Sequence, residues 1–107
     1  STLSEKLKKT VPLPDADVRA IIESHELRII KKAACQQDCL GLTEQEILDF
    51  HKTASFDVAN SSPRQHPNPR YVMRGKIRNT DYQITYIIGE NRTRISDISP
   101  NACNCGD

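Results

Sequence analysis

The 107-residue chain lacks tryptophan, and its aromatic residues make up only 5% of the sequence. Apolar residues reach 36%, so the core must be small and aliphatic. No apolar run approaches the roughly 18 residues that a membrane-spanning helix needs, and residues 1–10 are too polar for a signal peptide. We therefore expect one soluble domain, mature or excised from a longer chain, without stable membrane association. Its length excludes a catalytic barrel or a two-domain cofactor fold.

Several catalytic motifs are also missing. The chain has no Ser/His/Asp spacing, no Gly-rich phosphate loop and no His-x-x-x-His pair. Serine hydrolases, nucleoside triphosphatases and zinc proteases of that type are therefore poorly supported. We expect no cofactor, with a structural zinc ion at the cysteines as the one exception to weigh.

Four cysteines occur in two close pairs, Cys35 with Cys39 and Cys103 with Cys105. A bond within either pair would be strained, so cross-pairing is favoured if the thiols are oxidised. Cross-pairing would tie the C-terminal tail to the first helix across about 65 residues and stabilise the fold by about 3 to 4 kcal/mol. A four-thiolate zinc site and free thiols are the alternatives, since Cys35 and Cys39 would lie on one helix face.

The N-terminal half has helical periodicity. Residues 1–14 predict an arm or linker that ends in prolines, and residues 15–107 predict a single domain. Apolar residues recur at helical spacing over about 16–37 and predict a first helix there. A competing interpretation makes residues 18–22 a short strand, with the helix beginning after Ser24, because β-branched residues are dense there.

The next elements have clearer signals. Thr43 and Glu46 form a capping-box pattern, which predicts a second helix over about 44–53. Three prolines make residues 60–69 a loop. Strand-rich runs follow at 70–78, 82–88 and 92–98, separated by turn residues. This order predicts an α+β domain in which two N-terminal helices pack on a three- to four-stranded antiparallel sheet.

Charge is divided unevenly between the two halves of the chain. Residues 1–60 hold 8 Lys or Arg against 10 Asp or Glu, whereas residues 61–107 hold 7 against 4. The net charge of +1 therefore conceals an acidic helical half and a basic strand half. Basic half-domains suit phosphodiester backbones, because guanidinium groups bind phosphate bidentately.

The basic residues follow strand periodicity. The period-2 rule places Arg74, Lys76 and Arg78 on one face of the first predicted strand, and Arg70 joins them. On the last strand Arg92 and Arg94 extend this set. The alternative is an ordinary solvated sheet face whose charges prevent edge-to-edge aggregation.

Three histidines are candidates for proton transfer. Metal-independent RNA cleavage needs a base for the 2′-hydroxyl and an acid for the leaving oxygen, and a histidine can serve both roles near neutral pH. His25 lies in the first apolar stripe, where a packing role is the alternative. His51 lies late in the second helix, where it can complement the helix dipole. His66 lies in the proline-rich loop before the first basic strand.

A family resemblance rests on Glu23-Ser24-His25-Glu26-Leu27-Arg28, on Gly41-Leu42-Thr43-Glu44-Gln45-Glu46-Ile47 and on the strands over 70–98. The chain resembles small RelE-like toxins of the barnase, EndoU, colicin and RelE superfamily. The resemblance implies helices followed by an antiparallel sheet whose basic face cleaves RNA without a metal ion. Carried across, His25 and Arg28 correspond to the early His and Arg of the family, and Arg74, Thr93 and Arg94 to its polar sheet residues.

Our first hypothesis is therefore a ribonuclease toxin domain of a bacterial competition effector. It would be secreted or delivered into a target cytoplasm, cleave tRNA or another structured RNA, and be neutralised by an immunity protein. Arg70, Arg74 and Arg94 would hold phosphate, His25 or His66 would transfer protons, and Thr93 or Tyr86 would position the substrate. The alternatives are a non-catalytic binding module, such as an immunity or adaptor protein, and a secreted disulfide-bonded domain without enzymatic activity.

Overall fold

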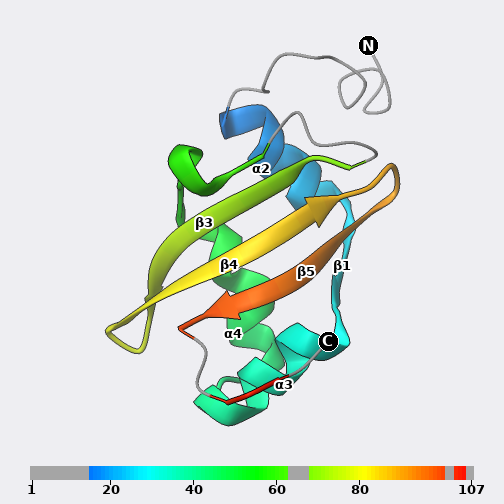
Figure 1. Cartoon of the computed structure of the whole chain (residues 1–107). Coiled ribbons are helices and arrows are strands. Elements are labelled where there is room, and N and C mark those ends of the chain that lie inside the picture. Colours follow the sequence, from blue (N-terminus) through cyan, green and yellow to red (C-terminus); the bar gives the residue numbers. More distant parts are fainter. Residues whose placement is uncertain (1–14, 63–67, 101–102, 106–107) are drawn as a thin grey trace.

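The computed structural model describes residues 15–62, 68–100 and 103–105, and over these residues the chain has an α+β fold (Figure 1). The predicted arm at 1–14 and the candidate His66 lie outside the described residues. Three α-helices, two 3-10 helices and five strands make up the described part. In chain order they are α2 (Asp15–Ser24), β1 (Glu26–Ile29), α3 (Lys31–Leu40), α4 (Glu44–Asp49), η1 (Phe50–Lys52), β2 (Ser55–Phe56), η2 (Val58–Asn60), β3 (Arg70–Ile77), β4 (Thr80–Ile88) and β5 (Arg92–Ser99).

The five strands form one mixed sheet in the order β1-β5-β4-β3-β2. Three of them, β3, β4 and β5, form the predicted antiparallel meander, and β2 extends it on one side. On the other side β1 pairs with β5 in parallel, which corrects the prediction of a purely antiparallel sheet with fewer strands. In Figure 1, α2 and α4 lie behind this sheet and α3 lies below it, near the lower ends of β5 and β1, while no described α-helix lies in front of the sheet.

The predicted first helix over 16–37 is wrong as a single element, because β1 divides it into α2 and α3. The alternative strand at 18–22 is also wrong, since those residues lie within α2. Val18 and Ile22 of α2 are buried, and Leu27 and Ile29 of β1 pack against the same core. The apolar residues of β1 therefore continue the helical spacing of α2 by coincidence. These residues form a strand because they pair with β5.

Local signals set the ends of the next elements. Thr43 and Glu46 form the predicted capping box: Thr43 Oγ1 accepts from the Glu46 amide at 3.1 Å, and Glu46 Oε1 accepts from the Thr43 amide at 2.9 Å. Gly41 ends α3 with a φ of 71°, a left-handed conformation that costs glycine least. The helix α4 is shorter than predicted, because a 3-10 turn replaces its last residues.

The hairpin between β3 and β4 turns at Arg78 and Asn79, whose φ angles are 52° and 66°. Two successive left-handed residues are typical of the tight turn that joins twisted antiparallel strands. The core lies between the sheet and the helices, and its fully buried members include Ile21, Ile22, Ala33, Ile47, Met73, Ile84, Tyr86, Ile88, Ile95 and Ile98. Aliphatic residues dominate this core, as the composition predicts.

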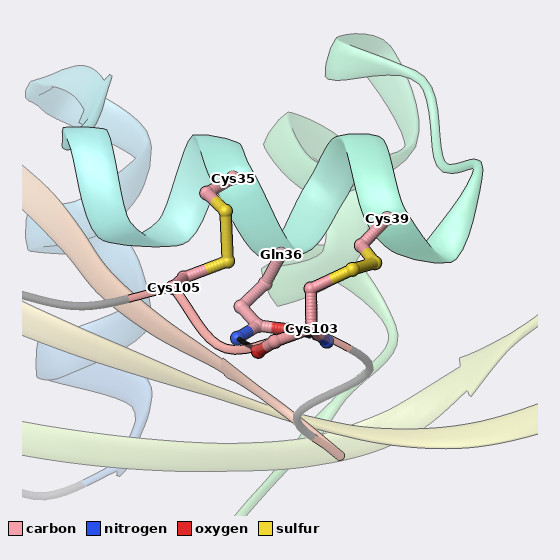
Figure 2. The surroundings of a disulfide bond; sticks show 5 residues. All are labelled: Cys35, Gln36, Cys39, Cys103 and Cys105. Atoms are coloured by element: carbon pink, nitrogen blue, oxygen red, sulfur yellow. Dashed lines mark hydrogen bonds between the residues drawn. A yellow bond between two sulfur atoms is a disulfide. The ribbon is translucent and has the colours of Figure 1, made fainter.

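All four cysteines are paired between their two clusters, as the cross-pairing alternative predicts (Figure 2). Cys35 is bonded to Cys105 and Cys39 to Cys103, each with a Cα–Cα distance of 6.0 Å. The zinc alternative is therefore wrong, because the sulfur atoms are consumed in disulfides. Among the described residues no group of three or more His, Cys, Asp or Glu side chains could hold a metal ion.

Gln36 fills the space between the two disulfides and is only 1% exposed (Figure 2). Its Nε2 donates to the Cys103 carbonyl at 2.8 Å, and its Oε1 accepts from the Cys103 amide at 3.4 Å. The tail is thus held to α3 by two covalent bonds and a buried amide. Two structural disulfides are typical of secreted or extracellular proteins that fold under oxidising conditions. Within the described ranges, no helix is long and apolar enough to cross a membrane.

Candidate nucleic-acid interface

The sheet has two different faces. Alternate side chains of β4, namely Tyr82, Ile84, Tyr86 and Ile88, are buried on the helix-covered face. Their register partners on β3 and β5 share that face, because directly paired residues point to the same side. The intervening residues point to the other side, which no described α-helix covers and which we call the open face. Two of its residues, Val72 and Thr85, are nevertheless buried. The candidate site is built from the residues of this open face.

One line of arginines crosses the open face. Arg28 on β1 is the register partner of Arg94 on β5, Arg94 is paired with Ile87 on β4, and Ile87 is paired with Arg70 on β3. Because neighbouring strands lie about 4.8 Å apart, Arg28 and Arg94 rise from adjacent positions, and Arg70 follows two strands from Arg94, beyond Ile87. We call Arg28, Arg70 and Arg94, together with Arg92 two residues before Arg94, the arginine row.

Most of the arginine row is free of anionic partners. Arg28, Arg92 and Arg94 are exposed, and none of them makes an ion pair or side-chain hydrogen bond with a described residue. Arg70 is half-buried and donates from Nη1 to the Asn60 carbonyl at 2.9 Å, which leaves its charge unneutralised. The acidic residue nearest in register is Glu26, the partner of Arg92. Such a row attracts anions, and its guanidinium groups can bind phosphate oxygens bidentately.

A second cluster lies on β3 and β4, further along the open face. Arg74 and Gln83 are register partners there, and the Asp57 carboxylate contacts both. Asp57 Oδ2 lies 3.2 Å from Arg74 Nε and accepts from Gln83 Nε2 at 3.2 Å. The backbone amide of Asn60 donates to Asp57 Oδ1 at 3.3 Å, and the Asn60 side-chain Nδ2 donates to Asp57 Oδ2 at 2.7 Å. Hydrogen bonds from Asn60 are the main reason that the pKa of Asp57 lies below its ordinary value, and the Arg74 charge adds to them.

A surface groove runs beside this cluster at the end of the sheet. It is lined by Arg74, Gly75, Asp81, Tyr82, Gln83, Ser99 and Pro100. Ser99 is paired with Gln83, so Arg74, Gln83 and Ser99 form a transverse line of hydrogen-bonding groups across three strands. Lys76, also on the open face, is exposed and has Asp81 as its register partner. The groove therefore offers both hydrogen-bond donors and acceptors, whereas the guanidinium groups of the arginine row offer donors alone.

Arg78 does not belong to the basic face, which corrects the period-2 prediction. Because Arg78 lies in the left-handed turn after β3, its side chain reaches the helical layer instead. Its Nε and Nη2 donate to Glu46 Oε2 and Oε1 at 2.8 and 2.6 Å, and Nη1 donates to the Gly41 carbonyl at 3.3 Å. This bidentate pair ties the hairpin to α4, a structural role that alternation along a straight strand does not predict.

His25 and Thr93 meet, but on the helix-covered side of the sheet. His25 Nδ1 lies 3.0 Å from Thr93 Oγ1, and Thr93 is completely buried. Burial lowers the pKa of His25, partly offset by a hydrogen bond with the Arg92 backbone. His25 Nε2 is also buried, with no hydrogen-bond partner among the described residues. The structure thus brings these two candidates together, while Arg28, Arg92 and Arg94 point to the opposite face.

Two further candidates are buried. The Tyr86 side chain is fully buried, and desolvation raises its pKa far above the ordinary tyrosine value. Its hydroxyl has no hydrogen-bond partner in the described part of the chain, so it does not reach the open face. His51 is also buried, and desolvation lowers its pKa. The Arg19 guanidinium donates to the backbone carbonyls of His51 and Ala54 at this position.

Asp57 is the site residue that the sequence analysis missed. The available signal is the Asp57-x-x-Asn60 spacing, which is typical of an aspartate that caps a short helical turn. That local pattern predicts the bonds to Asn60 but not those to Arg74 and Gln83, which lie 17 and 26 residues away. Comparison of the chain with protein-family models, with curated proteins and with solved structures finds no match.

Proposed function

We propose that the chain binds RNA through the open face of its sheet and that it is a ribonuclease toxin domain. The observation that carries the proposal is the arginine row, in which Arg28, Arg92 and Arg94 are exposed and form no ion pair with a described residue, while the half-buried Arg70 lies two strands from Arg94. Like charges placed opposite one another destabilise a sheet, so their presence at these positions favours a role in binding an anion. A phosphodiester backbone supplies a regular series of anions for such a row.

Cleavage requires proton transfer in addition to phosphate binding. His25, in contact with Thr93, and His66 are the candidate groups, as the RelE-like resemblance and the sequence order suggest. Arg94 and Arg28 would stabilise the charge that develops on the phosphate oxygens. The substrate class we propose is tRNA or another structured RNA.

The remaining elements of the proposal concern delivery and control. Disulfides support export through an oxidising compartment, and delivery into a target cell is a further part of the proposal. An immunity protein for such a toxin would present an acidic surface to the arginine row. Growth arrest on expression alone, relieved by an acidic partner encoded beside the toxin, would support this part of the proposal.

A second candidate function is a non-catalytic binding module. The observation in its favour is that His25 and His51 belong to the helix-covered side, with their pKa values lowered by burial. Neither is placed beside the arginine row. In this case the open face would hold its anionic partner without cleaving it.

One experiment separates the two candidates. Purified protein is incubated with total tRNA in EDTA, and both RNA integrity and RNA binding are measured. Cleavage by the natural chain that His25→Ala or His66→Ala abolishes, with binding retained, supports the ribonuclease. RNA binding without cleavage supports the module, and absence of RNA binding refutes the ribonuclease. Arg94→Ala should weaken binding, whereas Lys31→Ala, an exposed residue on α3 in the opposite layer, should not.

A further inference from the structure

We infer that the groove beside Arg74 and Gln83 receives a nucleobase that presents two adjacent hydrogen-bond acceptors beside a donor, namely guanine or cytosine. This inference rests on the proposed RNA binding and adds a base preference to it. The arginine row would hold phosphates, and the groove would read one base. Ile87, which is paired with both Arg70 and Arg94 of the row, and Gln83, in the groove, are four residues apart on β4. Row and groove are therefore about 14 Å apart along the strand, a span that a few nucleotides can cross.

Asp57 leaves the useful edge of Arg74 open. A guanidinium group has two edges that can each make a pair of parallel hydrogen bonds, one of which includes Nε. Asp57 contacts Arg74 at Nε, at 3.2 Å, so the edge formed by Nη1 and Nη2 has no partner among the described residues. The Arg74 side chain is 64% exposed, whereas that of Asp57 is only 10% exposed. The Asp57 carboxylate thus holds Arg74 from the protein side, and the guanidinium edge formed by Nη1 and Nη2 faces solvent.

Asp57 also fixes the orientation of Gln83. A carboxylate can only accept here, so the amide nitrogen of Gln83 must face Asp57 Oδ2, at 3.2 Å. The Gln83 carbonyl oxygen therefore points away from Asp57 and is available as an acceptor. Arg74 and Gln83 are directly paired on β3 and β4, where Cβ atoms lie about 5 Å apart. The groove thus presents a donor pair next to one acceptor, held by a common carboxylate.

The charge of the groove argues against a phosphate as its occupant. Asp57 offsets the charge of Arg74, and Asp81 adds a second carboxylate to the lining. A phosphate would meet repulsion from both carboxylates. In the arginine row the one described carboxylate at a paired position is Glu26, opposite Arg92, and it forms no described ion pair there. A neutral polar group is therefore the better occupant of the groove.

Two bases match the pattern of one donor pair and one acceptor. Guanine offers N7 and O6 as adjacent acceptors beside its N1–H donor, and cytosine offers O2 and N3 beside its N4 amino group. Adenine has a single acceptor beside its amino group on either edge, and the two acceptors of uracil are separated by a donor. Adenine and uracil would leave one N–H of Arg74 unpaired, and an unmade hydrogen bond at a binding site lowers affinity.

The test uses short 2′-O-methyl RNAs, which cannot be cleaved through the 2′-oxygen, with one G, C, A or U embedded in a run of uridines. Fluorescence anisotropy should show that the RNA with G, C or both binds roughly tenfold more tightly than those with A or U, the discrimination typical of one bidentate base contact. Gln83→Leu, which removes the acceptor, and Arg74→Lys, which keeps the charge but loses the paired donors, should each abolish that preference. Arg92→Ala, in the arginine row, should weaken binding of all four RNAs by the same factor.

The outcomes separate this inference from the proposed function. Equal binding of all four RNAs, or a preference that survives both groove variants, overturns the inference and leaves RNA binding in place. If no RNA binds, the proposed function fails, and the groove is then tested alone with GMP, CMP, AMP and UMP by NMR. Shifts of the Gln83 side-chain amide with GMP or CMP but not with AMP or UMP would support the inference. Their absence would overturn it.

Discussion

Arg28 on β1 and Arg94 on β5 are register partners in a parallel strand pair, and both are exposed on the open face. No described carboxylate forms an ion pair with either. A pair of cations at directly opposed positions lowers the stability of a sheet. Two arginines at these positions therefore lower the stability of the sheet but favour the binding of an anion.

The variant Arg28→Glu tests whether Arg28 lowers stability while it favours anion binding. We expect the free energy of unfolding to rise by about 0.2 to 1 kcal/mol, because a repulsive cross-strand pair becomes attractive. RNA affinity should fall at the same time. The slope of log affinity against log salt concentration should become shallower by about the amount that one phosphate contact contributes. Urea denaturation and binding at several salt concentrations measure the two effects. Lys31→Glu on α3 makes the same charge change on the other layer of the fold and should leave the salt dependence unaltered. A variant that is both less stable and equally able to bind RNA would contradict the assignment of Arg28 to the interface.

Tyr86→Phe tests whether Tyr86 positions a substrate. The Tyr86 hydroxyl is buried without a partner among the described residues, so its removal should eliminate a desolvation cost. We expect the free energy of unfolding to stay the same or to rise by up to about 1 kcal/mol, and RNA binding and cleavage to stay unchanged. Denaturant unfolding and the tRNA assay measure these quantities. Lower stability would indicate that the hydroxyl has a hydrogen-bond partner in the native protein.

Stability should fall with acid through two groups of residues, whose contributions begin to be lost at different pH values. Burial lowers the pKa of His25 and of His51 below the ordinary value of 6.5, so the unfolded chain binds protons more readily than the folded one. The free energy of unfolding should therefore fall as the pH drops through 6.5, with a slope of at most about 1.4 kcal/mol per pH unit for each histidine, and this fall should end below the folded-state pKa values. Above that range these two groups contribute no pH dependence. Asp57 and Glu46, whose pKa values are lowered by hydrogen bonds, should add a second fall at more acidic pH, from about their ordinary values of 3.8 and 4.5 downward.

Chemical denaturation over about pH 5 to 8 isolates the histidine range. His51→Gln and His25→Gln should each remove part of the slope, and the double variant should remove it, whatever the absolute stability of each variant. A slope that persists in the double variant would assign the pH dependence to other groups.

Local sequence signals predicted part of the fold, and non-local pairing determined the rest. The capping box of Thr43 and Glu46 and the strands of the meander were predictable, because turn residues and neighbouring side chains define them. The strand β1 was not, since residues 26–29 become extended only by pairing with residues 92–95. In the same way, strand alternation placed Arg74 on the open face but could not show that Asp57 supports it.

The two disulfides are expected to be strongly non-additive. They connect the same two short segments, residues 35–39 and 103–105, across separations of 70 and 64 residues. On the chain-entropy relation either bond alone closes a long loop and contributes about 4 kcal/mol, whereas the second bond closes only the small ring between the two segments and adds about 2 kcal/mol. Loss of one bond therefore leaves the long loop closed.

We accordingly expect Cys35→Ser with Cys105→Ser, or Cys39→Ser with Cys103→Ser, to lower the free energy of unfolding by about 2 kcal/mol, and replacement of all four cysteines to lower it by about 6 kcal/mol. Guanidinium denaturation of the three variants measures these losses, and the natural chain unfolded in the presence of a reductant should match the variant without cysteines. Gln36 offers an internal comparison. Gln36→Leu keeps both disulfides, but it leaves the Cys103 amide without its Gln36 partner and leaves the Cys103 carbonyl with the Cys105 amide alone, so it should cost about 1 to 3 kcal/mol in the oxidised protein. Losses that simply add between the two disulfide pairs would show that the bonds act through native-state contacts of each cysteine, and not through the loop that they close.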